Sequence, residues 1–135
     1  IDLSTNAPSM VRRIGAAMAA KGIAMLDAPV SGGTVGAEAA TIAIMVGGDK
    51  KVFDDALPVL QSFSANVIHM GGLGTGTVAK LVNNMMAFCN AAAAAEGLML
   101  GVTAGLDPQK LIQVVASSSG NSNAKPERPS FPRPS

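Results

Sequence analysis

The sequence predicts a mixed α/β chain, half of a sheet domain followed by the first helices of a helical domain. Three observations favour this fold class. Short apolar stretches separated by glycine pairs fill residues 23–72, a pattern typical of strands and turns. From residue 77 the pattern becomes helical and stays so to about residue 104. Hydrophobic residues make up 48% of the 135 residues and charged residues 14%, so the chain has enough apolar side chains for a folded core.

A first helix is predicted between Pro8 and Gly22. Thr5 or Asn6 can cap its N-terminus, because short polar side chains accept hydrogen bonds from the first free amides of a helix. Proline suits the first helical turn and glycine suits the position after the last one.

Three strands are predicted after this helix, over residues 23–30, 41–46 and 67–70. Residues 34–40 are small and read as a connection between the first two strands. A glycine run over residues 71–76 follows the third strand.

Two helices are predicted to begin at an aspartate cap. Asp49 precedes a helical apolar pattern that reaches Leu60, and Pro58 either interrupts this helix or starts a second short one. Asp107 precedes a helix over residues 108–116.

The long helix predicted over residues 77–104 is rich in Ala and Gly. Glu96 lies at the centre of its most apolar stretch, so we expect a buried helix of a soluble protein rather than a membrane span. Gly97, Gly101 and Gly105 recur at four-residue spacing, which gives a side that another helix can approach closely. Gly105 is also a suitable C-terminal stop.

Composition excludes several classes of protein. A net charge of +1 and four aromatic residues, all Phe, argue against nucleic-acid binding. The single cysteine, Cys89, excludes an internal disulfide and is read as a buried helix residue. The chain opens without Met and without a targeting segment, so we expect a fragment or an internal start. Residues 118–135 are Ser-, Asn- and Pro-rich, and we expect a loosely attached tail there.

Residues 74–79 match a dinucleotide-binding fingerprint by spacing. The acidic residue that follows at a suitable distance, Glu96, lies in the same long helix instead of on a second strand. Two interpretations remain, a pyrophosphate site and a close-approach hinge that leads into the helix, and we favour the hinge.

Lys80 and Asn84 lie one turn apart on one helical face, with Asn83 beside them. An ammonium and a carboxamide that point together among apolar neighbours suit proton transfer, although a lysine on an exposed face is the plain alternative. A second candidate is the strand end Ser31, Gly32 and Gly33, where a hydroxyl and two amides form either an anion site or an ordinary turn.

Two long motifs in the same order resemble the beta-hydroxyacid dehydrogenase family. The first is Asp27–Gly33, followed by Gly36 and Ala37 and by Ile44–Gly48. The second comprises Gly71, Gly74, Gly76, Lys80, Asn83 and Asn84. The resemblance covers residues 1 to about 122, and the branch of the family that acts on 3-hydroxyisobutyrate is the most similar.

The resemblance implies the C-terminal part of a Rossmann-like cofactor domain over residues 1–74 and the start of an all-α domain over residues 75–117. It also implies hydride transfer between NAD or NADP and a small 3-hydroxy acid such as 3-hydroxyisobutyrate, or its semialdehyde. Lys80 would be the general acid or base, and Asn84 would orient the substrate. The substrate carboxylate would bind Ser31, Gly32 and Gly33, and the nicotinamide would lie near Ser4 and Thr5, which are otherwise a simple helix cap. No metal site is expected.

The chain departs from the family pattern in three ways. Ala40 and Ala43 replace the usual Gly and Thr, the glycine-rich cofactor loop is not in the chain, and the resemblance stops near residue 122. We therefore expect a truncated or frame-disrupted product that is inactive alone. The alternative function is a catalytically inactive remnant whose long helix, residues 77–104, meets a partner protein.

The expected partners are a small hydroxy acid or semialdehyde and a second copy of the chain, as a homo-oligomer or dimer. No nucleic acid and no membrane is expected. The expected location is the cytoplasm in a bacterium or the mitochondrial matrix in a eukaryote.

Overall fold

The structure, a computed structural model, describes residues 1–121 and divides into two compact units. The first unit is residues 1–86 and the second begins at residue 87. The boundary falls inside a helix, and the domain boundary expected near residue 74 stays a prediction. The elements in chain order are α1 (Pro8–Ala19), β1 (Val30–Ser31), α2 (Gly33–Glu38), β2 (Ala43–Gly47), α3 (Lys50–Gln61), β3 (Asn66–Gly71), α4 (Thr75–Thr103) and α5 (Pro108–Ala116).

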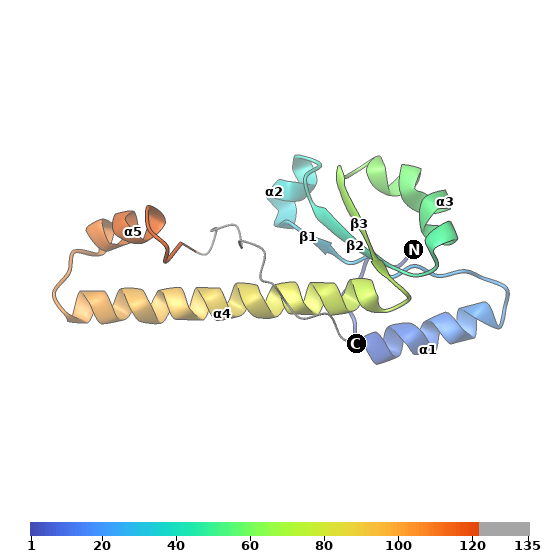
Figure 1. Cartoon of the computed structure of the whole chain (residues 1–135), viewed down its shortest axis with the longest axis horizontal. Coiled ribbons are helices and arrows are strands. Elements are labelled where there is room, and N and C mark those ends of the chain that lie inside the picture. Colours follow the sequence, from blue (N-terminus) through green and yellow to red (C-terminus); the bar gives the residue numbers. More distant parts are fainter. Residues whose placement is uncertain (122–135) are drawn as a thin grey trace, which may run out of the picture. The chain divides into compact units, whose positions relative to one another are not determined.

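The first unit contains a three-stranded sheet in the order β1-β2-β3 (Figure 1). β2 pairs antiparallel with β1 and parallel with β3. Helix α3 packs against β3. The core consists of buried apolar side chains from β2, from the segments that lead into β1 and β2, and from α3: Leu26, Ala28, Ile42, Ile44, Val46, Phe53 and Leu60.

The strand predicted over residues 23–30 is wrong in extent, because only Val30–Ser31 forms a regular strand there. Residues 26–29 are nevertheless extended and buried, and they bond to segments on both sides. Asp27 exchanges backbone hydrogen bonds with Gly47, and its neighbours bond Asp2 on the opposite side. Pro29 has no amide to donate, which interrupts regular pairing at this point.

Two local predictions about helices are also wrong. The N-cap of α1 is Ala7, whose methyl group cannot accept a hydrogen bond. Asn6 lies one position earlier, and its carboxamide oxygen accepts from the adjacent Ala7 amide instead of from the first turn of the helix. The connection expected over residues 34–40 forms α2 instead, a single short helix over Gly33–Glu38. Its Gly36 lies against Ile42, where a methyl group would be 3.2 Å from the Ile42 Cγ2.

Helix α3 confirms its predicted cap, since the Asp49 carboxylate accepts from the amides of Lys51 and Val52. The helix runs through Pro58 without a break, contrary to both expectations for this residue. Pro58 and Asp54 are exposed, so water can bond the Asp54 carbonyl that loses its helical partner.

Helix α4 is one continuous helix from Thr75 to Thr103 (Figure 1). Gly105 has a φ of +89° and ends it as predicted. Asp107 caps α5 by accepting from the Lys110 amide, also as predicted. Of the spaced glycines, Gly101 is approached by α5, since a methyl group there would lie 2.3 Å from a Leu111 Cδ, whereas nothing lies within 4 Å of that position at Gly97.

The expectation that the long helix is buried is wrong for the described residues. None of the most apolar window of α4 is buried, and Cys89 is exposed. Within residues 1–121, α4 is long and apolar enough to cross a membrane by length and composition alone, a test that core helices of soluble proteins also pass. The expectation of no membrane partner stays a prediction, and the tail expected over residues 118–135 lies mostly outside the described residues.

Candidate functional site

The carboxylate of Asp27 holds the first turn of α4. Asp27 is 1% exposed, and its Oδ1 accepts from the Gly74 amide while its Oδ2 accepts from the Thr77 amide, each at 2.7 Å. The first amides of a helix have no partner inside the helix, and a negative group at this end is stabilised by the helix dipole. One side chain on the sheet therefore fixes the start of the long helix.

The glycines of the run before α4 allow a close backbone approach. A methyl group at Gly76 would lie 2.2 Å from the Met45 carbonyl oxygen and 2.7 Å from that of Asp27. Gly47, opposite, has the Asp27 Oδ1 only 2.4 Å from the position its methyl group would take. The geometry supports the close-approach interpretation of residues 74–79 over a pyrophosphate site, because Asp27 already occupies two of the amides that a phosphate would need.

Ser31 ends β1 and is half-buried, and Gly32 and Gly33 follow it as a sharp turn. Gly32 has a φ of +139° and Gly33 a φ of +63°, values that favour glycine over any residue with a side chain. Nothing lies within 4 Å of the position a Gly33 methyl group would take. The turn thus leaves open space beside Gly33, two residues from Ser31.

Helix α4 reaches this turn through Asn83, whose Nδ2 donates to the Ser31 Oγ at 3.3 Å. Lys80 precedes Asn83 by three residues and Asn84 follows Lys80 by four, which puts each pair on neighbouring positions of the helix surface. Lys80 and Asn84 are both half-buried. The structure therefore brings the predicted strand end and the predicted lysine helix together.

Sequence reasoning gave no role to Asp27 or Asn83, although both lie inside the quoted motifs. Asn83 lies on the lysine helix close to Lys80, but only its bond to Ser31 shows that it faces the turn. No pattern in the sequence pairs Asp27 with amides that follow it by almost fifty residues.

Ser4 and Thr5 are exposed and follow a short bridge between Asp2 and Asp27. The bridge is parallel, so the chain runs from Asp2 toward Ser4 and from Asp27 toward Ser31 in the same direction. Ser4 and Thr5 therefore lie toward the same end of the sheet as Ser31. The Ser4 hydroxyl and the Ser4 amide, which donates to Asp2 Oδ1 at 2.9 Å, lower the pKa of the Asp2 carboxyl from its ordinary value of 3.8.

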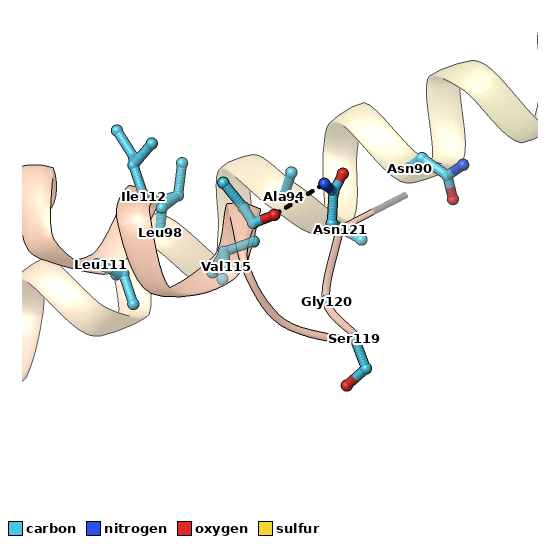
Figure 2. Close-up of a pocket in the computed structure, with 12 residues that line it drawn as sticks. Asn90, Ala94, Leu98, Leu111, Ile112, Val115, Ser119, Gly120 and Asn121 are labelled. Atoms are coloured by element: carbon cyan, nitrogen blue, oxygen red, sulfur yellow. Dashed lines mark hydrogen bonds between the residues drawn. The ribbon is translucent and has the colours of Figure 1, made fainter. Parts of the chain in front are cut away.

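The second unit contains an apolar pocket of about 650 Å³ between α4 and α5 (Figure 2). Among residues 1–121 no charged side chain lines it, and the Asn121 carboxamide donates to the Ala116 carbonyl at its edge. Its lining is mostly apolar, with Asn90, Ser119 and Asn121 as the polar residues. In the described part of the chain, no group of three His, Cys, Asp or Glu side chains could hold a metal ion.

Two protein-family models match the chain in succession. The NAD binding domain of 6-phosphogluconate dehydrogenase matches residues 1–72, and the NAD-binding domain of NADP-dependent 3-hydroxyisobutyrate dehydrogenase matches residues 74–133. The chain belongs to the beta-hydroxyacid dehydrogenase family. The family resemblance read from the two motifs is thereby confirmed, and residues 1–72 of this family member are part of a Rossmann-type NAD-binding domain.

Similar proteins in this dehydrogenase family come from several bacteria. A 3-hydroxyisobutyrate dehydrogenase of Pseudomonas aeruginosa is 49% identical over 120 residues, which cover 89% of this chain and 40% of that protein. A 2-(hydroxymethyl)glutarate dehydrogenase of Eubacterium barkeri is 44% identical over 92% of this chain and 41% of its own length.

A solved structure of Mycobacterium tuberculosis 3-hydroxyisobutyrate dehydrogenase with L-serine superimposes with a TM-score of 0.83. It is 42% identical, and the match covers 89% of this chain and 41% of that one. The chain thus spans about two fifths of the length of the relatives it matches.

Proposed function

We propose that this chain forms the substrate-binding and proton-transferring part of an NAD(P)-dependent dehydrogenase of small 3-hydroxy acids, such as 3-hydroxyisobutyrate or its semialdehyde. The observation that carries the proposal is the hydrogen bond between Asn83 and Ser31. It joins the turn that suits a carboxylate to the helix that carries Lys80.

The compounds named with the relatives support this substrate class. 3-Hydroxyisobutyrate, 2-(hydroxymethyl)glutarate and L-serine all contain the unit HOCH₂–CH(R)–COO⁻ and differ only in the group R. A site for this unit needs an anion-binding element and a proton-transferring group a short distance apart. We assign these two parts to the turn at Ser31 and the ammonium of Lys80, which lie on the two segments that the bond between Asn83 and Ser31 joins.

Each residue has one task in this proposal. The Ser31 hydroxyl and the amides of Gly32 and Gly33 hold the substrate carboxylate through charge-assisted hydrogen bonds. The Lys80 ammonium donates a proton to the carbonyl oxygen of the semialdehyde as that oxygen becomes the alcohol. In the reverse direction the neutral Lys80 amine accepts the proton of the hydroxyl group. Asn84, one turn from Lys80, orients the substrate.

Ser4 and Thr5 fit the nicotinamide end of the cofactor. Both are exposed, and the parallel bridge between Asp2 and Asp27 directs them toward the same end of the sheet as Ser31. Ligands of open α/β sheets bind where parallel strands end. The cofactor, NAD or NADP, supplies or accepts the hydride when it is bound.

The proposal is tested by NMR titration of the isotopically labelled chain with 3-hydroxyisobutyrate. We expect the amide signals of Ser31, Gly32 and Gly33 to shift, together with those of Lys80 and Asn84. Isobutyrate keeps the carboxylate and lacks the hydroxyl group. It should shift the amide signals of Ser31, Gly32 and Gly33 and leave the amide signal of Lys80 nearly unchanged. Shifts confined to other residues, or no shifts at millimolar ligand, would contradict the proposed function.

A second candidate function is an inactive remnant that acts as an interaction module. The exposed apolar side chains of α4 favour it, since contiguous apolar surface marks interaction sites. We propose a second copy of this chain as the partner in either case. The proposed location is the cytoplasm of a bacterium or the mitochondrial matrix of a eukaryote, because bacterial and mitochondrial proteins are both among the relatives.

A further inference from the structure

We propose that Asp27 is a positioning residue, whose buried carboxylate fixes Lys80 relative to Ser31. The inference rests on the proposed function in one respect, the use of Lys80 as the acid or base. The geometry that carries it is independent of that function.

Both oxygens of the Asp27 carboxylate are engaged by the same helix. Oδ1 accepts from Gly74 and Oδ2 from Thr77, each at 2.7 Å, and the side chain is 1% exposed. A carboxamide at this position could accept only one of these hydrogen bonds and would turn its NH₂ group toward the other amide. A buried amide left without an acceptor is costly, so the helix start would have to move.

A movement of the helix start is passed on to the lysine. Lys80 follows Thr77 by three residues, or about 4.5 Å along a helix that rises about 1.5 Å per residue. The first turn has no free space in which to absorb a shift, because Gly76 lies against the backbone of Met45 and Asp27. The part of α4 in the first unit, residues 75–86, is therefore expected to shift together, and Lys80 with it.

The same stretch of chain carries the other half of the proposed site. Ser31 follows Asp27 by four residues, and the two are joined by the buried residues Ala28 and Pro29 and the half-buried Val30. Helix α4 is thus bonded to this stretch at two points. Asp27 accepts from the amide of Thr77 in the first turn of the helix, and Ser31 accepts from the side chain of Asn83. Asp27 is the buried point of the two, and it sets the distance between the carboxylate turn and the lysine.

The first test measures this distance in the 135-residue chain without substrate or cofactor. A nitroxide label is attached at Val35→Cys, an exposed position of α2 four residues after Ser31, in a Cys89→Ser background, which removes the only other thiol and leaves the bond between Asn83 and Ser31 in place. The label should strongly broaden the NMR signal of the Lys80 amide. Asp27→Asn should weaken this relaxation enhancement beyond the scatter of repeat measurements, because the enhancement falls with the sixth power of the distance from the label to the amide.

Asp49→Asn is the matched control. Asp49 also accepts two backbone amides at the start of a helix in the same unit, but a single oxygen accepts both, so a carboxamide can replace it. We expect Asp49→Asn to leave the enhancement at Lys80 unchanged. All measurements are made below the melting transition of each variant. An unchanged enhancement in folded Asp27→Asn would overturn the proposal, even if its melting temperature fell.

If Asp27→Asn does not fold, hydrogen exchange of the unsubstituted chain tests whether the Asp27 carboxylate holds the start of α4. We expect the Thr77 amide to be protected as strongly as the Asp27 amide, which bonds the Gly47 carbonyl. Rapid exchange at Thr77 beside a protected Asp27 would show that the carboxylate does not hold the helix. Neither readout involves turnover, so a chain that binds no 3-hydroxyisobutyrate would refute the proposed function without deciding the role of Asp27.

Discussion

Lys80 is the residue on which the proposed reaction most depends. Its role is measurable in a chimera, the Pseudomonas aeruginosa relative with its matching 120 residues replaced by those of this chain. Lys80→Ala should lower kcat for 3-hydroxyisobutyrate about a hundredfold or more, the usual effect of losing a general acid or base. Lys110→Ala, an exposed lysine on α5, is the control and should leave kcat unchanged. Near-normal kcat in Lys80→Ala would remove this residue from the reaction.

Ser31 makes a separate contribution to substrate binding. In the same chimera Ser31→Ala should raise KM for the acid about tenfold, since a hydrogen bond to a charged group contributes roughly 1.5–3 kcal/mol. A bulky residue at Gly33 should raise KM further by filling the open space beside Gly33 that the carboxylate needs, and the positive φ of this position adds a loss of stability. Kinetics and thermal melts of the two variants separate the effects. Unchanged KM with a lower melting temperature would show that Ser31, Gly32 and Gly33 form a turn that does not bind the substrate.

The carboxyl of Asp2 gives a test by pH. Because the bonds from Ser4 lower its pKa in the folded chain, its contribution to stability is present above about pH 4 and is lost as the pH falls through the lowered pKa. Ser4→Ala removes the hydroxyl and should raise the pKa of Asp2 toward 3.8. An NMR titration of the Asp2 carboxyl carbon measures this change. Thr5→Ala should leave the titration unaltered, and an equal shift in both variants would contradict the assignment.

At the scale of residues, the sequence indicated candidates whose role depends on their own functional group and immediate neighbours. Lys80 and Ser31 were singled out as candidates because an ammonium-bearing helix and a hydroxyl beside two glycines form recognisable local patterns. Asp27 and Asn83 were not, because their tasks are defined by partners distant in the chain. An aspartate in a buried strand and an asparagine on a helix each fit many environments until the fold supplies the partner.

At the scale of elements, the glycines of α4 differ in what surrounds them. Gly76→Ala should lower the free energy of unfolding by about 3 kcal/mol or more, because the new methyl group meets backbone oxygen atoms that cannot turn away. Gly97→Ala, on the same helix with nothing within 4 Å, should raise it by about 0.5–1 kcal/mol. Denaturant unfolding of both variants checks the pair. Equal effects would show that the helix start is not packed as closely as the structure indicates.

Elements were predictable where local chemistry decides them. The caps at Asp49 and Asp107 and the stop at Gly105 lie where the sequence placed them, since each depends on neighbouring amides or on a positive φ. Helix α2 was missed because its sequence is short and glycine-rich, and its position depends on packing against Ile42. The exposed setting of Pro58 was equally beyond local reasoning, since it depends on which face of α3 meets the sheet.

At the scale of the whole molecule, the exposed apolar side chains of α4 predict self-association. Phe88 is 72% exposed, Met99 63% and Leu100 73%. Apolar surface of this extent on a helix is stabilised when a second copy covers it, and two-fold dimers are the commonest such assembly. Light scattering of the chain at tens of micromolar, the range in which weak assemblies still form, should therefore show a dimer.

A charge placed on this surface tests the same prediction. Phe88→Glu and Leu100→Glu should shift the scattering mass to that of a monomer while the helix content by circular dichroism is kept, because both side chains are exposed in the single copy. Gln109→Glu adds the same charge at an exposed position of α5 and should leave the dimer intact. If light scattering shows the unsubstituted chain to be a monomer, the predicted dimer is contradicted. Flotation of the chain with lipid vesicles would assign the apolar surface of α4 to a bilayer instead.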